Sequence, residues 1–257
     1  MMSKPTFLTY EQPLLTCMVQ ADNPDRIKEL ISRSEGTEAF GMQFCRMKPE
    51  YRTEETYREL FALAAPLPVY VTNYRYGNNE GKSDEDLAEG LLELADCGAT
   101  LCDVMGDLFD KQDDEVARDA VAIQKQMKLI DELHARGAEV LMSSHVFKFT
   151  PAERVLEIAL EHKRRGADIA KIVTGASSMD EQLENLRIVH LLKKELGIPF
   201  LFLANGESRI LRRVGGTLGN CTTLCVVEYD ALATKSQPLL SEMKTMRDLL
   251  GEAYDRI

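Results

Sequence analysis

The 257-residue chain is predicted to be an α/β protein that folds as a (β/α)8 barrel, or TIM barrel, with residues 1–257 in a single domain. Eight short apolar segments, mostly separated by helical patterns, follow one another along the chain, as is typical of parallel β/α folds. No linker or low-complexity segment interrupts this alternation. An open, doubly wound sheet remains the alternative, because a sequence does not reveal strand order.

The predicted strands are short apolar runs, often rich in β-branched or aromatic residues. They cover residues 14–19, 40–45, 68–74, 100–105, 140–145, 169–173, 198–203 and 222–228. The predicted helices carry apolar residues at helical spacing. They cover residues 23–33, 53–64, 83–96, 115–136, 151–165, 178–196, 208–213 and 241–254.

Local signals mark several of the helix ends. Ser83, with Asp86 three residues later, resembles a capping box. Thr150 is a candidate N-cap before Pro151, a residue that suits the first turn of a helix. Gly197 is expected to end the preceding helix as a C′ glycine.

Composition narrows the classes of function. The formal net charge of −11 argues against general nucleic-acid binding, so an anionic substrate would need local arginines. The first residues lack the apolar segment of a secretory signal, and no apolar run approaches membrane-spanning length. Six cysteines, several of them in apolar runs, indicate reduced thiols and a cytoplasmic protein. Cys221 and Cys225 have no further ligand nearby in the sequence, so no metal site is expected.

Two consecutive predicted strands carry a histidine and a lysine. His145 ends one strand, Lys171 lies inside the next, and the helix 151–165 between them makes a parallel unit. Burial lowers the pKa of a lysine, and a neutral amine can form a Schiff base with a ketone or aldehyde. A histidine one strand away can then move protons. Alternatively, Lys171 extends to solvent and His145 is an ordinary core histidine; their adjacency favours a site.

The same two strands resemble a known family. The segment Met-Ser-Ser-His-Val-Phe-Lys-Phe-Thr-Pro, residues 142–151, resembles the histidine-bearing strand of type I 3-dehydroquinate dehydratases. Gly-Ala-Asp-Ile-Ala-Lys-Ile-Val, residues 166–173, resembles their Schiff-base lysine strand. The resemblance implies that Lys171 forms the imine, that His145 is the general acid and base, and that no metal or redox cofactor takes part.

The resemblance also implies substrate-binding residues. Arg212 takes the place of the arginine that binds the substrate carboxylate, and Arg75 resembles a second substrate arginine. Ser236 resembles the substrate-contacting serine of the mobile loop after the last strand. Simpler roles remain open: Arg212 could cap a helix or pair with Glu207. Arg75 could be a solvated loop charge, and Ser236 an ordinary turn residue.

Several positions depart from the family pattern. Gln43 replaces a glutamate of the second strand, although its amide remains a candidate substrate contact. Met105 replaces the glutamate that orients the catalytic histidine, and Val146 replaces the aspartate that follows that histidine. Leu240 stands in place of a glutamine, for which Gln237 could substitute only in a rearranged loop. Because methionine cannot orient an imidazole, removing the histidine is expected to reduce the rate less than in an enzyme with an oriented histidine.

Three functions therefore remain open. The first is 3-dehydroquinate dehydratase or a close relative, which converts 3-dehydroquinate to 3-dehydroshikimate and water. The second is an imine-forming lyase or aldolase for a different, less hydroxylated keto acid, suggested by the changes at Gln43 and Met105. The third is a non-catalytic anion-binding protein on the same fold. The expected partner is a small carboxylate or keto acid, and the family also suggests a homodimer.

Overall fold

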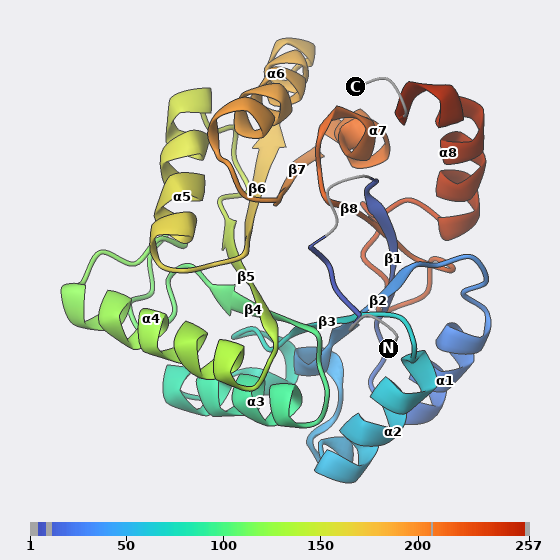
Figure 1. Ribbon diagram of the computed structural model, residues 1–257, viewed down its shortest axis with the longest axis vertical. Coiled ribbons are helices and arrows are strands. Elements are labelled where there is room, and N and C mark those ends of the chain that lie inside the picture. Colours follow the sequence, from blue (N-terminus) through green and yellow to red (C-terminus); the bar gives the residue numbers. More distant parts are fainter. Residues whose placement is uncertain (1–4, 9–11, 207, 255–257) are drawn as a thin grey trace.

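Eight parallel strands form one sheet that curls into a nearly closed barrel, as the computed structural model shows (Figure 1). The structure describes residues 5–8, 12–206 and 208–254. The strands are β1 (Leu14–Val19), β2 (Ala39–Gln43), β3 (Val69–Thr72), β4 (Leu101–Met105), β5 (Glu139–His145), β6 (Ile169–Ala176), β7 (Phe200–Gly206) and β8 (Thr222–Cys225). Their order is β7-β6-β5-β4-β3-β2-β1-β8, so each strand lies beside its neighbours in sequence and β1 also pairs with β8.

Helices surround the strands on the outside of the barrel (Figure 1). They are α1 (Pro24–Ser32), α2 (Glu54–Ala64), α3 (Asp84–Asp96), α4 (Ala120–Ala135), α5 (Ala152–Arg164), α6 (Met179–Glu195), α7 (Leu211–Leu218) and α8 (Leu240–Tyr254). Short 3-10 turns lie at η1 (Phe44–Arg46), η2 (Pro49–Tyr51), η3 (Gly77–Asn79) and η4 (Ser208–Ile210). The predicted barrel is therefore confirmed, and the open doubly wound sheet is excluded.

The seam between β7 and β8 is bridged by a side chain. The amide of Asn220 donates from Nδ2 to the Phe202 carbonyl at 2.9 Å and accepts from the Phe202 N–H at 2.8 Å. The Cys221 N–H also donates to the Phe200 carbonyl at 2.9 Å. Asn220 thus imitates a peptide group and satisfies β7 backbone groups where the regular ladder stops.

Side chains on alternate strand residues fill the interior of the barrel. One buried apolar cluster includes Tyr70, Leu101, Leu141, Ile169 and Leu201. Because strand residues two apart share a face, Lys171 must point inward like Ile169 and Val173. Two further clusters pack between the strands and the helices. The amine of the lysine therefore enters the barrel interior above an apolar floor.

The helix predicted over residues 115–136 begins later than expected, at Ala120. Its N-cap is Asp119, whose carboxylate accepts from the N–H groups of Val121 and Ala122. Glu115 has a left-handed φ of 49° and belongs to the loop after β4. Tertiary contacts hold this loop outside the helix, because the Ser144 hydroxyl donates to the Glu115 carbonyl at 2.7 Å.

Other helix signals agree less evenly with the structure. The Ser83–Asp86 capping box is present, and Gly197 follows α6 with a left-handed φ of 73°. Thr150 is not the cap of α5: its hydroxyl donates to the Lys148 carbonyl, and Pro151 takes the cap position. All six cysteines are buried and free of disulfides. Within the described ranges, no helix is long and apolar enough to cross a membrane.

Candidate active site

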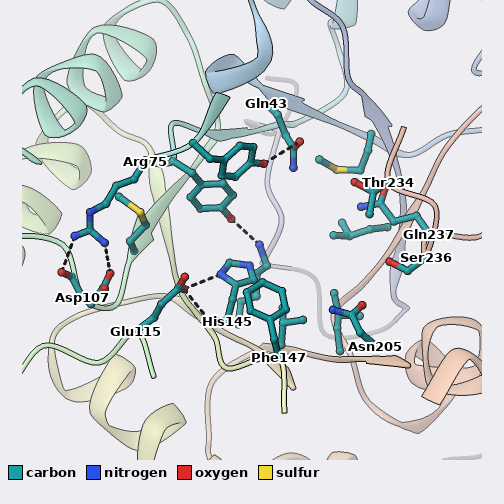
Figure 2. A pocket seen from close by; sticks show the side chains of 18 of the residues that line it. Gln43, Arg75, Asp107, Glu115, His145, Phe147, Asn205, Thr234, Ser236 and Gln237 are labelled. Carbon is teal, nitrogen blue, oxygen red and sulfur yellow. Dashed lines mark hydrogen bonds and ion pairs between the residues drawn. The ribbon is translucent and has the colours of Figure 1, made fainter. Parts of the chain in front are cut away.

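A cavity of about 530 Å³ opens at the carboxyl ends of the strands (Figure 2). All seven residues that the sequence predicted for a site line it, namely Gln43, Arg75, His145, Lys171, Arg212, Ser236 and Gln237. They come from β2, β5 and β6 and from segments after β3, β7 and β8. Closure of the barrel thus brings residues almost 200 positions apart in sequence to one cavity.

Lys171 lies in the middle of β6 and is only 5% exposed. Its Nζ donates to the hydroxyls of Tyr70, at 2.9 Å, and Tyr74, at 2.8 Å. A third partner is Asp103 Oδ2, at 3.1 Å, which makes an ion pair. The amine thus has three polar partners within an otherwise apolar interior, whereas the sequence predicted only apolar surroundings.

Asp103 is a buried carboxylate on β4 and receives several hydrogen bonds. The Ser143 hydroxyl donates to Oδ1 at 2.5 Å, and the hydroxyls of Tyr70 and Tyr74 donate to Oδ2. Burial by itself raises the pKa of Asp103, but the Lys171 charge and these hydrogen bonds bring that pKa below its ordinary value.

The environment of the two tyrosines disfavours their ionised forms. Burial, followed by the charge of Asp103, raises the pKa of Tyr70 and of Tyr74 well above its ordinary value. Both phenols therefore stay protonated at neutral pH and act as donors to the carboxylate. Sequence reasoning missed this trio, because Tyr70 and Tyr74 belong to an apolar strand pattern, and nothing local marks them as partners of a lysine about 100 residues later.

His145 is held by a carboxylate from the loop after β4. Glu115 Oε2 accepts from the backbone N–H of His145 at 2.7 Å and lies 2.8 Å from its Nδ1 (Figure 2). A carboxylate at Nδ1 places the ring proton there and leaves Nε2 for proton transfer. The expectation of an unoriented histidine, drawn from Met105, is therefore wrong, because Glu115 supplies from a loop what the strand residue lacks.

Two aromatic rings confine the imidazole of His145. Tyr74 meets it edge-on, with the ring centroids 5.5 Å apart, and Phe147 stacks on it at 5.7 Å. Phe147 has a left-handed φ of 57° and remains 65% exposed while it lines the cavity. The imidazole therefore packs between a buried tyrosine and an exposed phenylalanine.

The loop that carries Glu115 is braced from outside the barrel. Arg165 is fully buried beneath it, and its guanidinium donates to the carbonyls of Gly106 and Ala117, each at 2.8 Å. Gln126 Nε2 donates to the Leu108 carbonyl at 2.8 Å, and its Oε1 accepts from Arg165 at 2.7 Å. We call Arg165 and Gln126, together with Ser144, the loop brace.

The two predicted substrate arginines have different surroundings. Arg75 makes ion pairs with Asp84 at 2.7 Å and Asp107 at 2.6 Å, so carboxylates already balance its charge. The alternative that it is a solvated loop charge does not fit, since the half-buried side chain is held by these two carboxylates.

Arg212 is 7% exposed, and its hydrogen-bond partners among the described residues are neutral, the Ala204 carbonyl at 3.2 Å and Asn205 Oδ1 at 2.6 Å. Burial lowers the pKa of Arg212 to about 10, which leaves it a cation at neutral pH. Among the residues that the structure describes, no carboxylate pairs with it; Glu207 lies outside them. Arg212 is thus a cation in the cavity with its charge uncompensated by any described side chain.

The two glutamine amides of the cavity differ in their hydrogen-bond partners. Gln43 Oε1 accepts from Arg46 at 2.7 Å and from the Tyr76 hydroxyl at 3.3 Å. Gln237 is 4% exposed, and its buried Oε1 has no hydrogen-bond partner within the described part of the chain. Figure 2 shows Gln237 and Ser236 across the cavity from Glu115. An unpaired buried acceptor disfavours the empty state, so Gln237 is suited to receive a ligand hydroxyl.

The remaining departures lie in different places. Met105 lines the cavity as predicted by its strand position. Leu240 instead begins α8 and is 4% exposed in the core, and Val146 packs against the apolar cluster outside the strands. In the parts of the chain that the structure covers, no three His, Cys, Asp or Glu side chains are grouped to hold a metal ion.

The family model described as type I 3-dehydroquinase matches residues 46–254. The 3-dehydroquinate dehydratase of Methanosarcina acetivorans is 32% identical over 191 residues, which cover 72% of this chain and 73% of that enzyme. The enzyme of the same name from Klebsiella pneumoniae (strain MGH 78578) is 29% identical over 147 residues, which cover 56% of this chain and 57% of that protein.

Solved structures show the same fold. The 3-dehydroquinate dehydratase of Geobacillus kaustophilus superposes with a TM-score of 0.80 at 17% identity, covering 94% of this chain and 92% of that chain. The type I enzyme of Clostridium difficile, solved with covalently modified comenic acid, superposes with a TM-score of 0.78 at 16% identity, covering 94% of each chain.

Proposed function

Because the chain belongs to the type I 3-dehydroquinase family, whose members are carbon–oxygen lyases, we propose that it converts 3-dehydroquinate to 3-dehydroshikimate and water through a Schiff base on Lys171. The observation that carries the proposal is the meeting of three groups in one cavity. These are an inward-pointing lysine, a histidine oriented by a carboxylate, and a buried arginine whose charge no described carboxylate balances. Each matches one requirement of the reaction.

Lys171 is the nucleophile. Its amine adds to the ketone carbon of the substrate, and loss of water leaves an iminium ion. The iminium draws electrons from the neighbouring carbon and makes its C–H acidic. The apolar floor of the barrel, with Ile169 and Leu201, keeps bulk water from the imine and slows its premature hydrolysis.

His145 is the general base and then the general acid. With its Nδ1 proton directed to Glu115, Nε2 removes the acidified proton and later returns a proton to the departing hydroxyl. Elimination of that hydroxyl forms the conjugated enone, and hydrolysis of the imine releases the product and restores Lys171. Glu115 acts through His145 and is a positioning residue.

Arg212 binds the substrate carboxylate. A carboxylate brought beside it gains a charge-assisted hydrogen bond in a buried setting. Arg75 forms ion pairs with Asp84 and Asp107. Its main role is therefore to hold the loops at the mouth of the cavity, and its charge is not free for a substrate. Gln237, with Ser236 beside it, receives a substrate hydroxyl, while Gln43 offers its amide N–H₂ from the other side of the cavity.

The enzyme is further proposed to be a cytoplasmic homodimer that acts without a metal or redox cofactor. Six buried, free thiols support a reducing compartment. The homodimer rests on the resemblance to the family. Sedimentation equilibrium of the purified chain tests it, and a mass of one protomer over a wide concentration range would contradict it.

Borohydride trapping tests the function. The protein is incubated with 3-dehydroquinate and reduced, the adduct is located by intact mass and peptide mapping, and the absorbance of the enone product is followed in parallel. We expect an adduct on Lys171 together with product. The control is Lys163→Met, which removes a lysine that bonds the Leu196 carbonyl outside the cavity and should trap as the wild type does.

The other outcomes distinguish the alternatives. An adduct on Lys171 without product would show a competent amine and a different reaction. Neither adduct nor product from the folded protein would contradict the proposed activity. Tight binding of the substrate without an adduct would instead indicate a binding protein.

A further inference from the structure

We propose that Asp103, together with Tyr70 and Tyr74, is the acid–base group that activates Lys171 and then dehydrates its carbinolamine. The proposal rests on the Schiff-base function proposed above and assigns catalytic residues to its first step. In that step the tyrosines and the aspartate touch the reacting nitrogen directly, while His145 serves the later carbon–hydrogen and carbon–oxygen chemistry.

The three partners of Nζ leave the amine no free lone pair. An ammonium has three N–H donors, and Nζ has three acceptors, at 2.9, 2.8 and 3.1 Å. Addition to a ketone therefore requires that one proton leave the nitrogen first. Asp103 Oδ2 contacts Nζ, and both phenols contact Asp103 Oδ2 as well as Nζ, so each route for the proton ends on the same carboxylate oxygen.

The imidazole of His145 is less suited to this first transfer. No hydrogen bond joins Lys171 to His145 among the described residues. The Tyr74 ring meets the imidazole edge-on, with centroids 5.5 Å apart, while its hydroxyl bonds Nζ and Asp103. The site therefore contains two carboxylate-centred acid–base groups: Asp103 at the amine and Glu115 behind the histidine.

The protons of imine formation balance on Asp103. One ammonium proton moves to Oδ2, directly or through a phenol that accepts at its oxygen and donates its own hydroxyl proton. The amine attacks the carbonyl carbon, a C–N bond forms, and the ketone oxygen takes that proton from the carboxylic acid. A second nitrogen proton then passes through Asp103 to the hydroxyl, and the C–O bond breaks with loss of water. The third proton remains on the iminium nitrogen, and Asp103 ends as a carboxylate.

The positions of the hydroxyls explain why two tyrosines are present. Asp103 is buried, so its carboxylate cannot itself extend far into the cavity. A phenol within 3 Å of Nζ lies beside any carbon to which Nζ bonds, so it can present a proton to the oxygen on that carbon. Protonated phenols suit this relay because they can donate and accept at once.

Rapid-quench borohydride trapping tests the proposal in Tyr74→Phe, Tyr70→Phe, the double Phe variant and Asp103→Asn. We expect the rate of adduct formation on Lys171 to fall about 10²-fold in Asp103→Asn and in the double variant, with smaller losses in the single Phe variants. Tyr57→Phe is the matched control, since Tyr57 is equally buried but lies outside the cavity and should trap at the wild-type rate.

A pH series separates proton transfer from structural damage. Hydroxide can take the ammonium proton when Asp103 is absent, so the deficit of Asp103→Asn should shrink as the pH rises. A merely structural loss would not recover. The Phe variants keep the shape of the phenol ring and guard against the case in which Asp103→Asn fails to fold.

Two results would overturn the proposal: trapping at the wild-type rate in the double Phe variant, or a pH-independent deficit in folded Asp103→Asn. Failure of the underlying function is distinguishable, because then the wild-type protein itself would form no adduct.

Discussion

Lys171 and His145 each contact a carboxylate, but the two carboxylates are positioned by different kinds of structure. Asp103 is part of β4, which is separated from β6 by β5 alone. The register of the sheet places Asp103 near the amine of Lys171. Glu115 lies in a loop with left-handed φ, and its position depends on contacts made outside the barrel. A strand-borne group is positioned by the ladder of backbone hydrogen bonds, whereas a loop-borne group needs a separate support.

The support of Glu115 is the loop brace. Arg165 and Gln126 donate to carbonyls of the loop, and Ser144 donates to the Glu115 carbonyl itself. These groups are buried between the barrel and its outer helices, and unpaired polar groups there would be strongly unfavourable. The carboxylate that is absent at Met105 is therefore supplied by Glu115 in a loop, and this loop requires a larger buried polar network to hold it.

The largest expected effect concerns the amine side. Lys171→Met should lower kcat by about 10⁴-fold or more, because it removes the amine held by Asp103 and the two tyrosines, whereas Lys111, which also lines the cavity, belongs to the loop after β4. The same change leaves Asp103 buried without its cation and should reduce the free energy of unfolding by about 3–5 kcal/mol.

Denaturant unfolding of the double variant Lys171→Met/Asp103→Asn sharpens this result. Removal of the unpaired charge should recover most of the stability lost in the single variant, while activity stays absent. If the double variant is no more stable than Lys171→Met, the ion pair is not what holds Asp103 in the interior.

The next effect concerns the histidine side. Glu115→Ala should reduce kcat by about 10²-fold and change KM little, because the imidazole loses the partner that sets its tautomer and orientation. His145→Ala should reduce kcat by at least the same factor. Adduct formation on Lys171 should continue in both variants, since the carboxylate at the amine is intact.

Asp113→Asn is the matched control for the histidine side, as Asp113 is an exposed carboxylate of the same loop that does not line the cavity. If Glu115→Ala and Asp113→Asn were both fully active, Glu115 would not be needed for catalysis. The expectation that His145 works without an orienting group would then be restored.

The effect expected to be smallest at neutral pH is on stability alone, and it appears only as the pH falls. Burial, aided by the charge of Arg165, lowers the pKa of His162 from 6.5 to about 3, and its Nε2 lies 3.0 Å from the Ser144 hydroxyl. The unfolded chain therefore binds a proton more readily than the folded one. Stability is complete above the unfolded pKa and decreases as the pH falls from about 6.5 toward 3, by up to about 1.4 kcal/mol per pH unit.

Urea unfolding between pH 4 and pH 8 measures this slope. His162→Gln removes the titrating group, so the difference in stability between variant and wild type should depend on pH in that window and be constant above it. An unchanged difference throughout would show that His162 does not contribute to acid sensitivity.

Sequence reasoning placed residues most accurately where a strand carries them. Lys171 and His145 lie on neighbouring strands with adjacent registers, and alternation along a strand is enough to place both toward the interior. It was least accurate for the residues between β4 and α4. Helical periodicity continues smoothly back to Glu115, so the pattern alone could not show that the loop brace holds those residues outside the helix.

By itself the sequence determined the alternation of strands and helices, the barrel and the family, and it singled out Lys171 and His145 as candidates, because periodicity, caps and short motifs are local properties of the chain. Only the tertiary structure decided which charges meet. It joined Glu115 to His145 across 30 residues and Asp103 to Lys171 across 68. It also balanced the charge of Arg75 with two carboxylates, while the hydrogen-bond partners of Arg212 among the described residues are neutral. Electrostatic partners depend on distance in space, and the closure of the barrel sets those distances.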